Sequence, residues 1–87
     1  MYIKLLGTEV ACGISSGAAS TFGNARTVRL INTTSAVHLV TLEQADDTDI
    51  GTISLAPNES IHLLKGPTDK IFAANAGVKG AAVGFAN

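Results

Sequence analysis

The run of short alternating segments between Arg26 and Ala74 constrains this sequence more than any other feature. Each segment is rich in β-branched or aliphatic residues, and each boundary carries Asn, Asp, Gly or Pro. Short segments separated by such turn residues are typical of antiparallel sandwiches and small barrels. We therefore predict an all-β fold, a small antiparallel β-sandwich or barrel of about seven strands.

The predicted strands cover most of a single domain of 87 residues. Their ranges are 2–6, 9–14, 26–32, 36–43, 50–55, 60–65, 70–75 and 78–86. Both faces of strand 36–43 are partly apolar, which predicts a central strand or one covered on both sides. In the last strand, Gly80 and Gly84 indicate a bulge or a close backbone approach.

Residues 7–25 are expected to differ from the strands around them. Gly, Ala, Ser and Thr make up almost all of residues 14–25, with Phe22 as the single large aromatic side chain. A stretch of this composition buries too little apolar surface to order itself. We predict an extended N-terminal arm, which is either a flexible surface loop or a segment ordered on a neighbouring subunit, with Phe22 as the docking residue.

The composition favours a subunit of an assembly over a free monomer. Hydrophobic residues make up 46% of the chain and charged residues 15%, against about 25% charged in an average domain. Apolar surface that charges do not cover is typical of an interface, which predicts a homo-oligomer. The six basic residues are scattered and the net charge is −1, which argues against nucleic acid as a partner. No segment approaches the roughly 20 apolar residues of a membrane span, and the first ten residues do not form a secretory signal.

The sulfur and imidazole groups do not form an obvious site. Cys12 is the only cysteine, which excludes an internal disulfide, and its apolar neighbours predict a buried side chain. His38 and His62 lie on the second face of their strands and would approach each other if those strands paired. Two ligands are too few for zinc, which needs four donors or three and a water, so we predict no metal.

The carboxylates and serines give no catalytic pattern either. Asp46, Asp47 and Asp49, followed by Gly51, are superficially similar to a calcium loop, but the terminal Glu and flanking helices are missing. A solvated hairpin tip is the better interpretation. No serine lies in a Gly-x-Ser-x-Gly elbow, and no glycine-rich phosphate loop precedes a helix. We therefore predict no enzyme activity, no cofactor and no small-molecule substrate.

Two stretches carry a family resemblance: TVRLINTTSAVHLVTL, and GTISLAPNESIHLLKGPTDKIFAAN before a Gly/Ala-rich final strand. Together they resemble small all-β structural proteins of tailed bacteriophages, particularly myovirus-like phages of marine cyanobacteria. The resemblance covers residues 27–86 and consists of turn and core signals. It implies a virion protein present in many copies and assembled in the host cytoplasm. A capsid decoration (cement) protein bound to the major capsid protein is the first expectation, and a neck or tail component is the second.

The residues expected to contact a partner are one aromatic and four basic side chains: Phe22, Arg26, Arg29, Lys65 and Lys70. Two other classes of function stay open. A carbohydrate-binding or host-adhesion module would display exposed aromatic rings, and this chain has three Phe and one Tyr. A metal-dependent enzyme or sensor would require His38, His62 and a third donor to converge.

Overall fold

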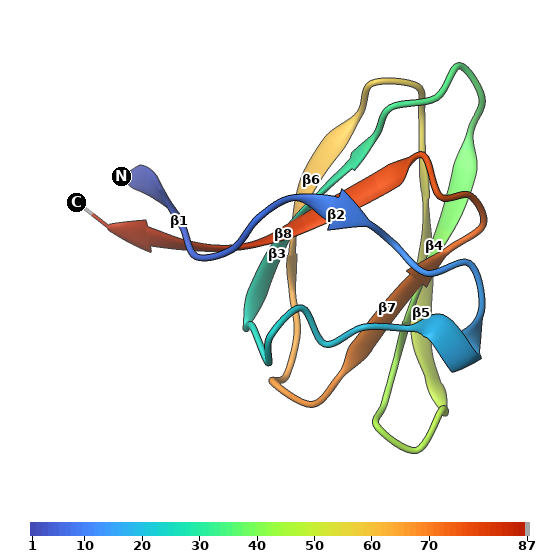
Figure 1. The fold of residues 1–87 in the computed structure, drawn as a ribbon, viewed down its shortest axis with the longest axis horizontal. Helices are drawn as coiled ribbons and strands as arrows, with labels where there is room; N and C mark the ends of the chain where they lie inside the picture. The colour runs from blue at the N-terminus through green and yellow to red at the C-terminus, as the bar shows by residue number, and fades with distance from the viewer. Residues whose placement is uncertain (87) are drawn as a thin grey trace.

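The chain folds into two antiparallel sheets, which confirms the predicted all-β class. The structure is a computed structural model that describes residues 1–86 (Figure 1). The elements are β1 Tyr2–Leu5, β2 Val10–Ala11, the 3-10 helix η1 Ser16–Ala18, β3 Thr27–Asn32, β4 His38–Glu43, β5 Asp49–Leu55, β6 Ser60–Leu64, β7 Lys70–Ala73 and β8 Val78–Ala86. Within these residues, no helix has the length and apolar character needed to cross a membrane.

The last strand organises the first sheet. Its strand order is β1-β8-β3-β6, and β2 also pairs with β8. The second sheet has the order β5-β4-β7, so the prediction that residues 36–43 form a central strand is confirmed. β3 reaches only as far as the pair Val28–Ala82, whereas β8 continues to Ala86. The final residues of β8 therefore overhang the sheet and pair with β1.

The core forms where the alternating residues of β3 face the second sheet. Val28 and Leu30, which alternate along β3, are fully buried. Asn32 is also fully buried, and its side-chain amide donates hydrogen bonds to the carbonyls of Ala36 and Leu55 at 2.7 and 2.9 Å. The polar group is therefore satisfied and joins the two sheets. The buried cluster comprises Cys12, Phe22, Val28, Leu30, Val40, Leu55, Ile71, Ala73 and Val78.

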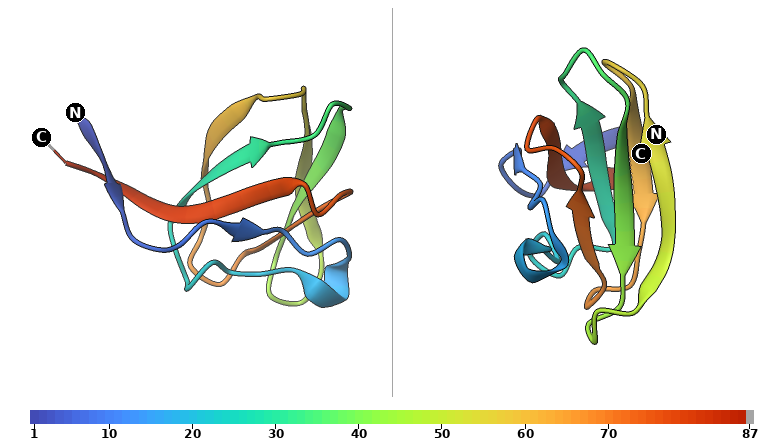
Figure 2. Two further views of the ribbon diagram at one scale, coloured as in Figure 1. Left: turned by 45° about the horizontal axis from the view of Figure 1, so that its top comes forward. Right: turned by 90° about the vertical axis from the view of Figure 1, so that its right-hand side faces the viewer.

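The N-terminal segment 12–22 seals one side of the sandwich. The Cys12 amide donates to the carbonyl of Val78 in the first sheet at 2.9 Å. Ser20 and Ile71 of the second sheet exchange backbone hydrogen bonds at 3.1 and 2.9 Å. The segment thus connects the two sheets of its own chain (Figure 2). The arm predicted for residues 7–25 was expected to be a flexible loop or to lie on a neighbour. In the structure, backbone hydrogen bonds place its central part, residues 12–22, on its own chain.

Phe22 turns inward to join the core. It begins a run of three positive φ angles, 53° at Phe22, 70° at Gly23 and 58° at Asn24, which reverses the chain. Its ring is 8% exposed and lies against Gly80, where a Cβ would come within 2.8 Å of two ring carbons. Gly80 is thus approached closely by a side chain, where a bulge or a close backbone approach was predicted. The predicted docking role of Phe22 is wrong, because the ring is already covered by its own chain.

The opposite side of the sandwich stays open. β5 ends the second sheet and β6 ends the first, and the turn 56–59 joins them. An apolar hollow of about 190 Å³ lies between them, lined by residues that include Val40, Leu42, Ile53 and Leu63. Ile53 is 43% exposed because no further strand covers this edge in the described part of the chain.

Candidate assembly surface

A two-stranded ribbon projects from the body of the molecule. β1 and the overhanging end of β8 form it, and both chain ends lie at its tip (Figure 1). The register places Ile3 opposite Phe85 and Leu5 opposite Val83. Directly opposite residues of an antiparallel pair point to the same face, so these four apolar side chains share one face of the ribbon.

The other face of the ribbon is apolar as well. Tyr2, Lys4 and Leu6 alternate with the first set, and small residues of β8 lie opposite them. A Cβ on Gly84 would lie 3.4 Å from a δ carbon of Leu6, so the leucine lies directly over the glycine. Tyr2 is 77% exposed. Both faces of the ribbon therefore present apolar side chains to solvent.

The amount of exposed apolar surface on the ribbon approaches that of an interface. The described residues include thirteen large exposed hydrophobic side chains, and six of them are on the ribbon or at its base: Met1, Tyr2, Ile3, Leu5, Leu6 and Phe85. Their exposed fractions run from 43% to 83%. At about 150–200 Å² for a large side chain, they expose about 600–750 Å² together. A standard protein interface buries about 800 Å² per partner, and because this area is divided between the two faces of the ribbon, each face supplies part of such an interface.

The apolar surface continues from the ribbon across the outer face of the first sheet. The rings of Phe85 and His62 meet edge to face, with centroids 5.1 Å apart. Leu64 lies two residues along β6 on the same face and is 78% exposed. We call the exposed apolar residues Ile3, Leu5, Leu64 and Phe85 the outer patch. It spans the sheet from β1 to β6.

A groove lies at the base of the ribbon. Its volume is about 760 Å³, and its walls come from residues 6–10 and 20–27 with residues 82–84 beside them. Arg26 is exposed and lines it, which leaves this predicted contact residue accessible to a partner. The predicted contact Arg29 is half-buried on β3, and its guanidinium forms an ion pair with Glu9 at 3.4 Å.

Lys65 does not lie on an accessible surface, contrary to its predicted contact role. Its side chain is 5% exposed, and Nζ donates to the carbonyls of Gly66 and Pro67 at 3.1 and 3.4 Å. Burial lowers the pKa of Lys65, and the carboxylate of Asp69 partly opposes that shift. The lysine follows β6 directly and folds over the turn that leads to β7.

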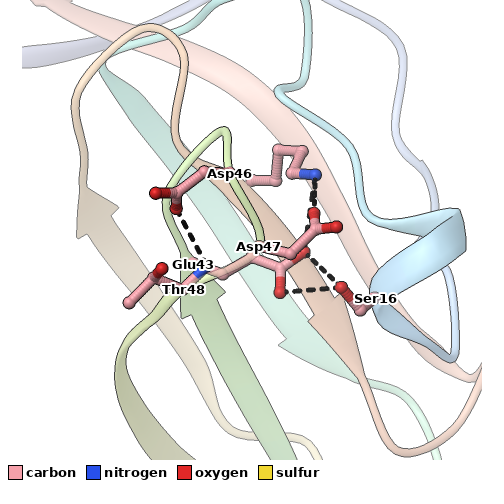
Figure 3. Close-up of polar contacts among 6 residues, drawn as sticks. Ser16, Glu43, Asp46, Asp47 and Thr48 are labelled. Atoms are coloured by element: carbon pink, nitrogen blue, oxygen red, sulfur yellow. Dashed lines mark hydrogen bonds and ion pairs between the residues drawn. The ribbon is translucent and has the colours of Figure 1, made fainter.

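Lys70 belongs to a polar cluster that fastens the N-terminal segment (Figure 3). Its ammonium pairs with Asp47 at the tip of the β4–β5 hairpin and with Glu43 at 3.7 Å. Glu43 is fully buried, and both of its carboxylate oxygens accept from the Ser16 hydroxyl at 3.0 Å. The hydrogen bond to Asp47 raises the pKa of Lys70, and this cation is therefore engaged within its own chain.

The other candidate chemistries stay apart. His38 lies on β4 and His62 on β6, in different sheets, so the strands that carry them do not pair. Asp46 lies at the hairpin tip, where hydrogen bonding by Thr48 lowers its pKa, in agreement with the predicted turn. Cys12 is buried as predicted, and burial raises the pKa of its thiol to about 11. Across residues 1–86, no group of three or more potential ligands could hold a metal ion.

The exposure of the outer patch was not predicted from the sequence. A strand was predicted at residues 2–6, but its pattern did not show that Ile3 and Leu5 would be uncovered. One signal was present: the predicted last strand, residues 78–86, is longer than the strand at residues 26–32 beside which it lies. A strand longer than its neighbour extends past the end of that neighbour.

Comparisons with known proteins add no relative. The sequence matches no protein-family model, and neither the curated proteins nor the solved structures gave a match.

Proposed function

We propose that this chain is a non-enzymatic structural subunit of a phage virion, and specifically a capsid decoration protein. The observation that carries the proposal is the projecting ribbon with its exposed apolar side chains. The sequence resemblance to small all-β phage proteins supplies the virion context. The partner would be the major capsid protein, with a neck or tail protein as the second candidate.

The architecture suits attachment to a repeating surface. The body is held by a buried core cluster and a polar cluster, which suits it to carry the ribbon as a scaffold. The ribbon offers two apolar faces, and the outer edge of β1 can accept main-chain hydrogen bonds from a partner strand. Many copies on a lattice would then add avidity to a modest individual affinity.

The observed aromatics give less support to a carbohydrate-binding module. Phe22 is buried and Phe72 is half-buried. Tyr2 and Phe85 are exposed, but the register places them on opposite faces of the ribbon. They do not form one stacking platform for a sugar ring.

Co-sedimentation with capsids built from the major capsid protein of the parent phage tests the proposal. The variants Leu5→Ser and Phe85→Ser each remove apolar surface from the ribbon, and we expect both to weaken capsid binding at least tenfold. Val37→Ser is the matched control, because Val37 is 60% exposed but lies far along the chain, just before β4. We expect the control to bind like the unaltered protein.

Labelling of whole virions separates the two virion locations. Antibody against the protein should decorate the head at many points if the first candidate is right. Label confined to the neck or tail would replace capsid decoration by the second candidate. Capsid binding that is unaffected by both ribbon variants would contradict the role of the ribbon.

A further inference from the structure

The free edge of β6 has the hydrogen-bonding pattern of an unpaired strand. Lys65 donates its backbone N–H to the carbonyl of Arg26, just before β3, and the carbonyl of Glu59 accepts from Asn32 of β3. Backbone groups alternate in direction along a strand, so Ser60, His62 and Leu64 direct their N–H and C=O groups to the open side. In the described residues no strand pairs there. Three donors and three acceptors are thus available in register.

The segment that forms this edge is complementary to itself about His62. If two copies of it run antiparallel with His62 opposite His62, each residue meets the one at an equal distance on the other side. Ile61 then meets Leu63, and Ser60 meets Leu64. The apolar pair lies on the inner face, where both residues are half-buried and pack against the core cluster. The pairing would extend that apolar layer into the second copy.

The charges at the two ends of the segment also match. In the same register Glu59 of one copy lies opposite Lys65 of the other, once on each side of the axis. Neither residue takes part in any of the ion pairs found within residues 1–86. Lys65 now donates to two carbonyl oxygens of its own turn beside the carboxylate of Asp69, and Glu59 accepts from the Ala56 amide at 2.8 Å. Both side chains therefore turn toward the open edge when they pair across it. Opposite charges across the edge favour this register over neighbouring ones.

We propose that a second copy of this chain pairs with β6 in antiparallel orientation about a two-fold axis at His62. The first sheets of the two copies become one continuous sheet, joined by six backbone hydrogen bonds from residues 60, 62 and 64 of each copy. This deepens the proposed function by naming one partner surface. It leaves the ribbons at the far edges of the joined sheet, where both can reach a capsid.

Cysteine cross-linking tests the register. The variant His62→Cys places two thiols opposite each other at a Cα separation of about 5.5 Å, within the range of a disulfide. The native Cys12 is buried with a pKa of about 11 and does not compete. We expect oxidised His62→Cys to run as a covalent dimer on a non-reducing gel. Leu64→Cys alone should not cross-link, because two such thiols lie about 14 Å apart along the strands. Mixed with Ser60→Cys, it should.

A backbone variant tests the same edge without a thiol. His62→Pro removes an N–H that faces the open side, so no bond within the chain is lost. We expect light scattering to show a dimer for the unaltered protein and for His62→Ala, and a monomer for His62→Pro with an unchanged circular dichroism spectrum. A monomeric unaltered protein, or equal cross-linking of Leu64→Cys and His62→Cys, would overturn the proposal. Loss of capsid binding with the cross-link intact would overturn only the proposed function.

Discussion

The two long sides of the sandwich end in opposite ways. On one side, residues 12–22 carry hydrogen bonds from β8 to β7 and place Cys12 and Phe22 in the gap between the sheets. On the other side, β5 and β6 have no neighbouring strand within residues 1–86, and an apolar hollow remains between them. The side built from small polar residues is sealed, whereas the side built from aliphatic strands is open.

This difference indicates which side of the sandwich is suited to binding another chain. Monomeric proteins protect open sheet edges with charged residues, proline or bulges. β5 has an irregular register opposite Leu42 and Glu43, but β6 contains neither a proline nor a permanently charged residue. The sealed side depends on residues 12–22 for stability, whereas the unprotected edge of β6 can pair with another chain. Substitutions on the two sides should therefore have different consequences.

The largest effect on folding is expected from Phe22→Ala on the sealed side. The ring fills the space over Gly80, and truncation of a buried phenylalanine costs about 3–5 kcal/mol. Chemical denaturation followed by circular dichroism measures the loss. A cost below about 1 kcal/mol, within the range of surface substitutions, would mean that the segment does not seal the core.

A smaller effect is expected from Glu43→Gln. The variant keeps the volume of the buried side chain but removes the negative charge that accepts from the Ser16 hydroxyl and pairs with Lys70. We expect the free energy of unfolding to fall by about 1.5–3 kcal/mol. Asp47→Asn is the matched control, because Asp47 also pairs with Lys70 but its side chain is 61% exposed. Its cost should stay below about 1 kcal/mol. Equal costs for the two variants would show that burial does not distinguish the carboxylates.

A pH-dependent effect, absent at neutral pH, is expected from Cys12. Burial raises the pKa of its thiol from 9.0 to about 11, so the folded chain holds the proton more tightly than the unfolded chain does. Stability should therefore be unaffected below pH 9 and should fall as the pH rises towards 11. Cys12→Ala should flatten that decline. Lys70, whose pKa is also raised, titrates in both proteins and cancels from the difference curve. If the free energy of unfolding fell equally with pH in the unaltered protein and in Cys12→Ala, the burial of Cys12 would be contradicted.

The smallest effect on folding is expected from Leu64→Ser on the open side. Leu64 is 78% exposed, so its replacement should change the free energy of unfolding by no more than about 0.5 kcal/mol. Denaturation at a low protein concentration, where association does not contribute, gives the relevant value. A loss comparable to that of Phe22→Ala would erase the contrast between the two sides.

The strands could be predicted because their apolar residues alternate. The last strand was placed at residues 78–86 and is observed at Val78–Ala86. The closure by residues 12–22 could not be predicted, because backbone hydrogen bonds leave no pattern in side-chain composition. The inward turn of Phe22 depends on a positive φ angle at Phe22 itself, a conformation that a phenylalanine rarely adopts and that the sequence therefore does not predict.

The candidate surface was less predictable than the fold. The composition indicated that apolar surface would remain exposed, and apolar side chains are exposed in the structure. They are not the residues that were predicted to contact a partner. Phe22 and Lys65 are buried, Arg29 and Lys70 are paired within the chain, and Arg26 alone among the five is exposed and unpaired in the described residues. Basic residues were chosen for their charge, whereas the surface that stays open is made by strands of unequal length.

The position of β8 governs the order in which this protein can fold. Three strands, β1, β2 and β3, pair with β8, the last strand in the chain. During synthesis β3 can pair only with β6 until residues 78–82 have left the ribosome, and the N-terminal strands β1 and β2 have no partner before then. Pairing Tyr2 with Ala86 then closes a loop of nearly the whole chain, and folds dominated by such distant pairs form in milliseconds to seconds. At high expression levels, the incompletely folded chain should therefore aggregate even though the folded protein is stable.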